Sequence, residues 1–380
     1  MVTTGLSGNE IYCLRKLGYA PGEIIVGNSI WSLGFLGSLT SGIRNLTGGE
    51  IPEITSLVYQ GRANAIYRLE YEAQQKKERG ALSIRSDFIH HLGTGNIEFL
   101  SVGSGVHSHE SAENDQFTFS SSLDGDEMYC NHDAGYDSRR FVFGNVAYAA
   151  GLGRNILGTF KTLARGEIKE FSDIYNKTRH IALQRIIDEA KKNNANSVLN
   201  IKTKVMNYSP GISEMIMIGT ASYNNSLPQE FIQNPVTSDL TSTELWSITN
   251  MGMIPMKLLM GTSVYSLGIT GSISSFFKSF TRGEIPELTS LIYEAREKSL
   301  GLINAEGNAI GADDVIGTKV YMYELGGGLI EFLAIGTAIK KVDFVKTNTE
   351  QLIPQAFIED RDSFFDWHGL TLGNVSEPSV

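Results

Sequence analysis

The two cysteines, Cys13 and Cys130, are the residues best suited to hold a soft metal ion, because thiolates prefer such metals. Each directly follows a tyrosine, at equivalent places in the chain. No Cys-x-x-Cys pair occurs, and the one histidine near a cysteine is His132, so a closed structural zinc site is not expected. An isolated cysteine on a strand is more often a small buried packing residue. We favour packing and keep Cys13 and Cys130 as the candidate metal ligands, which a symmetric ring could bring together.

The histidines give a weaker metal signal. None of the seven recurs at a regular spacing; they are His90, His91, His107, His109, His132, His180 and His368. The densest group, His107-Ser108-His109-Glu110, falls in a segment expected to link two domains. We therefore favour a solvent-exposed loop over a metal site there.

Three sets of glutamates recur along the chain and could support acid–base catalysis if burial separated their pKa values. The sets are Glu10/Glu127/Glu244, Glu50/Glu167/Glu284 and Glu98/Glu214/Glu331. The second set is expected at helix starts, where capping and the helix dipole explain acidic residues. The other two sets are expected on strands, where cross-strand pairs or contacts around a ring suffice. We therefore favour structural roles.

Motifs of known catalytic chemistry are missing from the sequence. We find no nucleophile elbow, P-loop or dinucleotide fingerprint. The glycine run Gly326–Gly328 precedes an expected strand rather than a helix, so it lacks the geometry that binds phosphate. We expect no catalytic and no cofactor-binding residues, and a metal ion is the one cofactor left open.

The elements that must position these residues come in three copies, because landmarks recur every 117 residues. Examples are Leu6/Leu123/Leu240, Gly27/Gly144/Gly261 and Gly49-Glu50/Gly166-Glu167/Gly283-Glu284. Such a period is far longer than the roughly 20–50 residues of solenoid repeats, so each copy is expected to be a whole domain. The predicted domains span residues 1–108, 118–226 and 235–342, followed by a tail at 343–380.

The tail has an unusual composition. It carries seven acidic and two basic residues together with the large aromatic residues Phe357, Phe364, Phe365 and Trp367. Two interpretations are equally favoured: the tail packs over a repeat or a neighbouring subunit, or it is disordered.

The third copy predicts the elements of one domain. Two short apolar runs between Leu240 and Met260, separated by turn formers, predict a strand, a turn and a second strand. The segment from Val264 to Phe280 predicts one or two short amphipathic helices. A long helix should begin near Pro286, because proline is tolerated in the first turn. Its buried stripe is Leu288, Leu291, Ile292, Ala295, Ser299 and Ile303.

Two more strands should follow this helix. The turn Gly311–Gly317 leads into the first, and Gly326–Gly328 joins it to the second, Leu329 to Ile339. Each unit is thus predicted to be β-β-α-β-β, an α+β domain in which an antiparallel sheet packs on one main helix.

These motifs resemble the YbjQ-like family, whose members are often labelled as heavy-metal-binding proteins and are usually single domains of this length. The resemblance covers nearly everything except the linkers and the tail. It rests on Thr3-Thr4, Leu6, Gly8 and Glu10-Ile11; on Gly22-Glu23, Gly27, Phe35 and Gly42-Ile43-Arg44; on Gly49, Arg62, Gly80 and Ala81; and on Tyr293, Arg296, Gly311-Ala312-Asp313, Val315-Ile316-Gly317 and Gly336-Thr337-Ala338. The second copy diverges most, with Asn194 in place of a glycine.

The resemblance implies a dodecin-like α+β subunit that assembles into a pentameric ring. Five chains of three tandem domains would then form stacked rings. The family implies no catalytic mechanism.

Composition narrows the function classes. A net charge of −10 argues against nucleic acid as a partner, since binding its backbone needs basic patches. No stretch approaches the roughly 18 apolar residues of a membrane span, and the first ten residues do not resemble a signal peptide. Two cysteines in 380 residues suggest a reducing compartment. We therefore expect a cytoplasmic protein.

The function expected from the sequence is a non-enzymatic, ring-forming homo-oligomer that acts as a scaffold or binding protein. Fusing three domains raises their effective concentration for one another. The alternative is binding of a heavy metal or small ligand in the ring lumen or between subunits. An enzyme that uses the recurring glutamates is the third and least favoured hypothesis.

Overall fold

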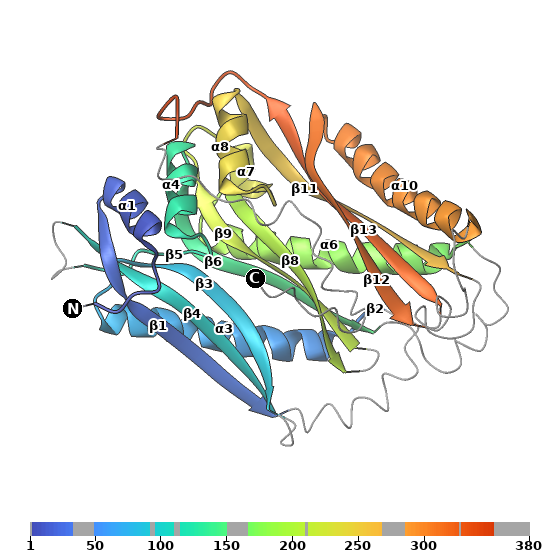
Figure 1. Cartoon of the computed structure of the whole chain (residues 1–380), viewed down its shortest axis with the longest axis horizontal. Helices are drawn as coiled ribbons and strands as arrows, with labels where there is room; N and C mark the ends of the chain where they lie inside the picture. The colour runs from blue at the N-terminus through green and yellow to red at the C-terminus, as the bar shows by residue number, and fades with distance from the viewer. Residues whose placement is uncertain are drawn as a thin grey trace, which may run out of the picture.

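The computed structural model describes residues 2–32, 49–91, 96–109, 115–149, 166–209, 212–267, 286–326 and 328–352 (Figure 1). Each repeat contains a short helix, a long strand, a long helix and a hairpin of two long strands. In the first repeat these are α1 (Gly8–Lys16), β1 (Tyr19–Ser32), α3 (Pro52–Gln75), β3 (Gly80–His91) and β4 (Asn96–Ser108). In the second they are α4 (Gly125–Asp133), β6 (Asp137–Ala149), α6 (Lys169–Lys192), β8 (Ser197–Ser209) and β9 (Ile212–Tyr223). In the third they are α8 (Ser242–Asn250), β11 (Met253–Ser266), α10 (Pro286–Ala309), β12 (Asp314–Gly326) and β13 (Leu329–Lys341).

The last strand of each repeat lies at the centre of an antiparallel sheet, with orders β1-β4-β3, β6-β9-β8 and β11-β13-β12. Four two-residue strands extend these sheets at their edges: β2 (Gly49–Glu50), β5 (Phe119–Ser120), β7 (Gly166–Glu167) and β10 (Val236–Thr237). A short helix, α7 (Glu230–Gln233), lies between the second and third repeats. The predicted α+β class, with a sheet packed on one main helix, is confirmed.

The long helices follow the predicted pattern. Proline occupies the first turn of α3 and α10, where its missing N–H had no partner to lose. The predicted stripe on α10 is buried except for Ile292, which is half-buried. On α3, Ala65 and Leu69 are fully buried, and on α6 so are Ala182 and Ile186. Among the described residues no helix is long and apolar enough to cross a membrane.

The recurring glycine of the first long strand lets each long helix lie directly on its own sheet. A Cβ at Gly27 would lie 2.0 Å from the carbonyl oxygen of Ala65, and one at Gly144 would lie 2.3 Å from that of Ala182. The same holds for Gly261 in the third repeat. Contacts this short are excluded for any residue with a side chain, so this packing explains why the glycine recurs at the repeat period.

The start of each repeat differs from the prediction, because the first predicted strand is a helix. The run Leu245-Trp246 lies in α8, and Cys13 and Cys130 lie on α1 and α4 rather than on strands. The deciding signal is a capping box. In α8 the backbone N–H of Thr241 donates to Glu244 Oε2 at 2.8 Å, and the backbone N–H of Glu244 donates to Thr241 Oγ1 at 3.2 Å.

The helix predicted from Val264 to Phe280 is also wrong where it can be checked. Val264 to Ser266 continue strand β11, and residues 268–285 lie outside the described residues. The hairpin predicted at Gly326–Gly328 is confirmed, since β12 and β13 pair antiparallel on either side of it. Of the tail, residues 343–352 are described, and Phe357, Phe364, Phe365 and Trp367 lie beyond them.

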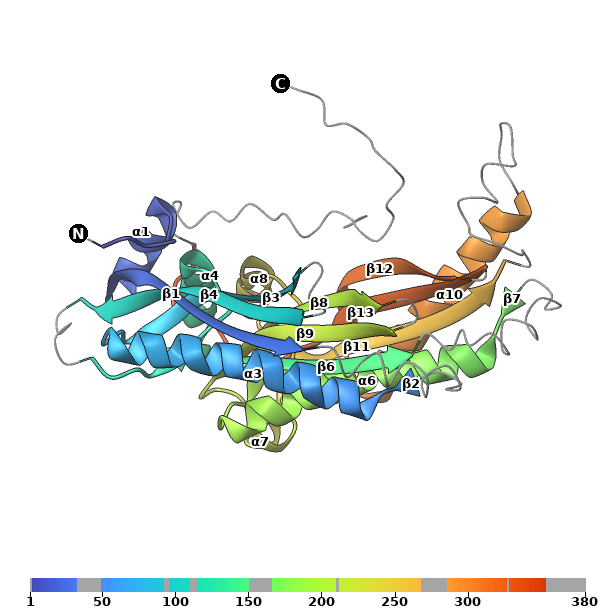
Figure 2. The same ribbon diagram turned by 90° about the horizontal axis from the view of Figure 1, so that it is seen from below.

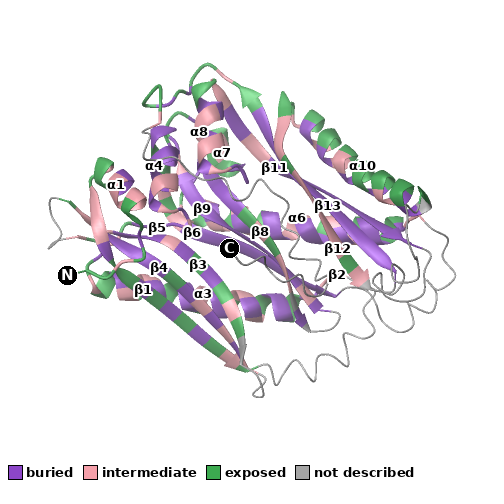
Figure 3. Ribbon diagram, viewed as in Figure 1, coloured by how far each residue is buried: buried purple, intermediate pink, exposed green. Residues whose placement is uncertain are grey.

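The three repeats follow one another in a single series of alternating layers (Figure 2). Helix α3 packs against β1 and β4 of its own sheet and against β6 of the next, and α6 packs in the same way against β6, β9 and β11. Sheets two and three are therefore covered on both faces, and their central strands are buried almost throughout (Figure 3). This series differs from the predicted arrangement, in which the repeats of a chain occupy separate stacked rings, because α3 and α6 each pack directly on the sheet of the next repeat.

Candidate functional site at the repeat junctions

The first junction begins where repeat one docks on the edge strand of repeat two. Strand β2 pairs with the end of β6, with Gly49 opposite Ala149 and Glu50 opposite Tyr148. The N–H of Ile51 then donates to the carbonyl oxygen of Ala147 at 2.8 Å. Repeat one thus supplies partners for edge groups that would otherwise face water.

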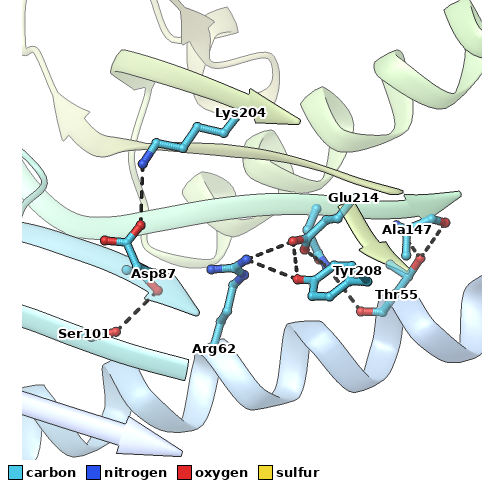
Figure 4. A network of polar contacts seen from close by, with 10 residues as sticks. Thr55, Arg62, Asp87, Ser101, Ala147, Lys204, Tyr208 and Glu214 are labelled. Atoms are coloured by element: carbon cyan, nitrogen blue, oxygen red, sulfur yellow. Dashed lines mark hydrogen bonds and ion pairs between the residues drawn. The ribbon is translucent and has the colours of Figure 1, made fainter. Parts of the chain in front are cut away.

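The hydroxyl of Thr55 continues this docking along the same strand. Its oxygen accepts a hydrogen bond from the N–H of Ala147 at 3.0 Å (Figure 4). The Thr55 side chain is buried by this contact. The start of helix α3 is therefore fixed to the backbone of the next repeat.

Two turns further along α3, Arg62 forms an ion pair with Glu214 of strand β9 in repeat two. Nη2 of Arg62 lies 2.8 Å from Glu214 Oε2, and both side chains are 0% exposed (Figure 4). The Tyr208 hydroxyl donates to the same carboxylate oxygen at 2.6 Å, and Asn145 Nδ2 donates to Oε1 at 2.9 Å. The carboxylate thus has hydrogen-bond donors on both oxygens.

Burial and pairing act oppositely on these groups. Burial lowers the pKa of Arg62, but the charge of Glu214, together with Tyr208 and the hydrogen bonds to both residues, more than compensates and raises the pKa above its usual value. The guanidinium also lies 5.4 Å from the ring centroid of Phe99, which provides a cation–π contact. Burial raises the pKa of Tyr208 well above its usual value, so its hydroxyl stays protonated and donates. The pair is therefore charged and buried.

The second junction repeats this chemistry with different residues. Arg179 of α6 binds Glu331 of β13 through two hydrogen bonds, Nε to Oε1 at 3.0 Å and Nη2 to Oε2 at 2.6 Å. Ser172, at the place of Thr55, accepts a hydrogen bond from the N–H of Val264 at 2.9 Å. Strand β7 pairs with the end of β11 as β2 pairs with β6. Both internal junctions are thus built by one recurring set of contacts.

A titratable pair is specific to the second junction. Nε2 of His180 on α6 lies 3.6 Å from Glu306 Oε2 on α10, and Lys257 Nζ lies 2.7 Å from Glu306 Oε1. The neighbouring carboxylate of Glu306 raises the pKa of His180. The charge on this histidine therefore depends on pH in the physiological range.

The described members of the recurring glutamate sets make structural contacts, although two sets lie in other elements than predicted. Glu10, Glu127 and Glu244 accept hydrogen bonds from helix N-caps and are not on strands. Glu50 and Glu167 lie in two-residue strands ahead of the helices, and Glu284 lies outside the described residues. Glu50 binds Arg185 of the next repeat at 2.6 Å. Glu98, Glu214 and Glu331 are on strands as predicted.

The partner of the third glutamate set was not apparent from the sequence. Arginine recurs with the same period, at Arg62, Arg179 and Arg296. Matching this period to that of Glu98, Glu214 and Glu331 could have suggested an ion pair. Arg62 and Arg179 each pair with the glutamate of the next repeat and not with that of their own. Predicting this requires knowing that α3 and α6 pack on the sheet of the following repeat.

The candidate metal residues Cys13 and Cys130 are both fully buried free thiols on helices α1 and α4, which pack together. Burial raises the pKa of Cys13 to about 11 and that of Cys130 to about 12. Both are therefore protonated at neutral pH, and a metal ion would have to displace these protons. Among the described residues no group of three or more His, Cys, Asp and Glu is placed to hold a metal ion.

The described histidines lie apart, and three of them each face a carboxylate. His107 Nε2 lies 3.1 Å from Glu78 Oε2, and His132 Nδ1 lies 2.9 Å from Asp137 Oδ1. His132 and Asp137 line a hollow of about 340 Å³ together with Tyr19 and Tyr136. The side chains of His90 and His91 and the whole of His368 lie outside the described part of the chain.

Comparison with known proteins gives one family for all three repeats. Residues 18–107, 134–224 and 248–342 each match the YbjQ family, whose description reads "Putative heavy-metal-binding". The encapsulin nanocompartment protein Rv1762c of Mycobacterium tuberculosis is 29% identical over 229 residues, covering 58% of this chain and 84% of that protein.

Shorter relatives match over about one repeat. The UPF0145 protein of Thermosipho africanus is 40% identical over 80 residues, covering 21% of this chain and 74% of that protein. The UPF0145 protein of Pseudothermotoga lettingae is 36% identical over 91 residues, covering 23% of this chain and 86% of that protein. No solved structure matches the chain.

Proposed function

Because the chain belongs to the YbjQ family, with three matches in tandem, we propose that it is a homo-oligomeric scaffold protein without catalytic activity. Its three domains would span residues 1–108, 118–226 and 235–342, with residues 343–380 as a separate tail. The observation that carries this proposal is the junction that occurs twice within one chain, with a buried Arg–Glu pair each time. A module whose recurring contacts serve to hold the next module is suited to assembly.

The charged groups support a structural rather than a catalytic role. Glu214 and Glu331 are fully buried and neutralised by arginine, and Glu50 is bound by Arg185. Catalytic carboxylates need access to a substrate, which the fully buried carboxylates of Glu214 and Glu331 do not have. The Mycobacterium tuberculosis relative is named for a nanocompartment, and this also favours a role in a large assembly.

The resemblance suggests a ring of five chains as the assembled form, located in the cytoplasm, with the repeats of each chain side by side in one series rather than in stacked layers. Both cysteines are free thiols, as expected of a reducing compartment. Native mass spectrometry of the purified full chain tests the oligomer. We expect a particle of several chains with one defined mass. A monomer in dilute neutral buffer would contradict the proposal.

The second candidate function is binding of a heavy metal. It is favoured by the packing of α1 on α4, which puts the two helices that carry Cys13 and Cys130 side by side in one chain. Metal analysis of the purified protein and of the Cys13→Ala/Cys130→Ala variant tests it. Metal bound stoichiometrically to the natural protein and absent from the variant would support this function. Negligible metal in both would exclude these residues as ligands.

A further inference from the structure

The two ends of the series of repeats are unlike each other and complementary. Strand β1 alternates between buried and exposed residues along much of its length (Figure 3), and several of the exposed ones, on the face opposite α3, are apolar. On β1, Ile24, Val26 and Ile30 are 38%, 42% and 59% exposed. Their counterparts 117 residues later are Phe141, Phe143 and Ala147, none of which is more than 7% exposed. The first sheet therefore exposes the surface that the preceding helix covers in repeats two and three.

At the other end, helix α10 exposes the residues that α3 and α6 bury. The Arg296 side chain is 46% exposed, whereas those of Arg62 and Arg179 are 0% exposed. Thr289, at the place of Thr55 and Ser172, is likewise exposed. Arg296 pairs only with its exposed neighbour Glu297, at 3.2 Å, among the ion pairs of the described residues. Exposed pairs of this kind contribute little, so Arg296 is available to a better partner.

The first sheet holds a receptor for Arg296 that has the geometry of the internal one. Glu98 lies in β4 where Glu214 lies in β9, and it pairs across the sheet with Ile30 as Glu214 pairs with Ala147. Asn28 Nδ2 donates to Glu98 Oε1 at 3.0 Å, just as Asn145 Nδ2 donates to Glu214 at 2.9 Å. The strand position and the asparagine hydrogen bond therefore match those of the site that binds Arg62.

A tyrosine provides a second correspondence. In the first junction the Tyr59 hydroxyl donates to Glu189 of repeat two at 2.8 Å, and its ring lies 5.1 Å from that of Phe143. The counterpart of Tyr59 in α10 is Tyr293, which is 57% exposed. The counterparts of Glu189 and Phe143 in the first repeat are Glu72 and the exposed Val26.

From these correspondences we propose that α10 of one chain docks on the open face of the first sheet of a second copy, with Arg296 bound to Glu98 and Tyr293 to Glu72. This inference rests on the proposed homo-oligomeric function and specifies its interface. The second copy is the occupant because its α10 carries Arg296 and Tyr293 at the helix positions that Arg62 and Tyr59 hold in α3. A long helix in this register already covers the equivalent sheet face twice within the chain. The contact is head-to-tail, so it generates a closed ring or an open filament rather than a two-fold dimer.

Charge reversal on both sides of the interface tests this pairing. The Arg296→Glu variant would place two carboxylates at the contact, and the Glu98→Arg variant would place two guanidinium groups there. We expect each variant alone to associate with a dissociation constant raised by about 30-fold or more. The double variant Arg296→Glu/Glu98→Arg should recover association, because the reversed helix of each chain then meets the reversed sheet of the next. Lys340→Glu, an exposed charge reversal on β13 away from this face, should keep the natural mass.

Native mass spectrometry reads the outcome, and circular dichroism confirms that each variant is folded. If the natural protein is oligomeric and both variants keep its mass, this interface is wrong although the scaffold proposal stands. If the double variant fails to associate, Arg296 and Glu98 are not partners. A monomeric natural protein would instead contradict the proposed function itself. Ile30→Glu offers a second test at an exposed site and should also weaken association.

Discussion

At the scale of single residues, two buried arginines hold the chain together. Arg62 and Arg179 lie on helices of one repeat and neutralise carboxylates of the next, with no exposed surface on either partner. Transfer of both charges out of water is costly, so such a pair adds specificity more than net stability. The pair fixes how adjacent repeats pack because breaking it costs free energy. A repeat packed in any other register would leave a buried charge without its partner.

Replacing Arg62 by methionine should destabilise the protein by about 3–5 kcal/mol, because Glu214 is left charged and buried. The double variant Arg62→Met/Glu214→Leu should recover most of this loss, since no unpaired charge remains. Urea unfolding of the natural protein and both variants measures the difference. Equal stabilities of the single and double variants would show that the loss comes from packing and not from the unpaired carboxylate.

The His180–Glu306 pair predicts a pH-dependent second junction. The carboxylate raises the pKa of His180, so the folded protein binds this proton more tightly than the unfolded chain. The stabilisation is fully present below about pH 6.5, the usual histidine pKa, and is lost as the pH rises through the higher folded value. His180→Asn should lower the melting temperature by about 1–3 °C at pH 6 and by less at pH 8. The exposed His109→Asn is the control, and a difference that does not change with pH would contradict the pairing.

At the scale of elements, sequence patterns predicted the long helices well because their buried stripe has a regular spacing. The same patterns gave strands for α1, α4 and α8, since short apolar runs fit either element. The Thr241-x-x-Glu244 capping box was present in the sequence and would have favoured a helix. The short strands β2 and β7 could not have been predicted, because they form only against the edge of the following repeat.

The recurring strand glycines yield a prediction at this scale. Gly144→Ala should destabilise the protein by about 1–3 kcal/mol, because its Cβ would contact the backbone of α6 at the Ala182 carbonyl oxygen and force the helix away. Gly301→Ala is the matched control on α10, where nothing lies within 4 Å of the added methyl group. It should stabilise the protein by about 0.5–1 kcal/mol through helix propensity. Thermal unfolding compares them, and similar effects of the two changes would contradict the close strand–helix contact.

At the scale of the whole molecule, the period of 117 residues predicted three like domains but not their arrangement. Stacked rings and a single series are equally consistent with a repeated sequence. The structure selects the series, because each of the first two long helices lies between its own sheet and the next one (Figure 2). The series leaves one open sheet face and one open helix face. If every junction is alike, a closed ring is made of chains joined head to tail, and its number of repeats is a multiple of three.

An electron cryomicroscopy reconstruction of the native particle tests this account most directly. We expect sheets and helices to alternate without interruption from one chain into the next, with α10 lying on the first sheet of its neighbour. Repeats of one chain found in separate layers, or two chains joined through the same face of each, would contradict it.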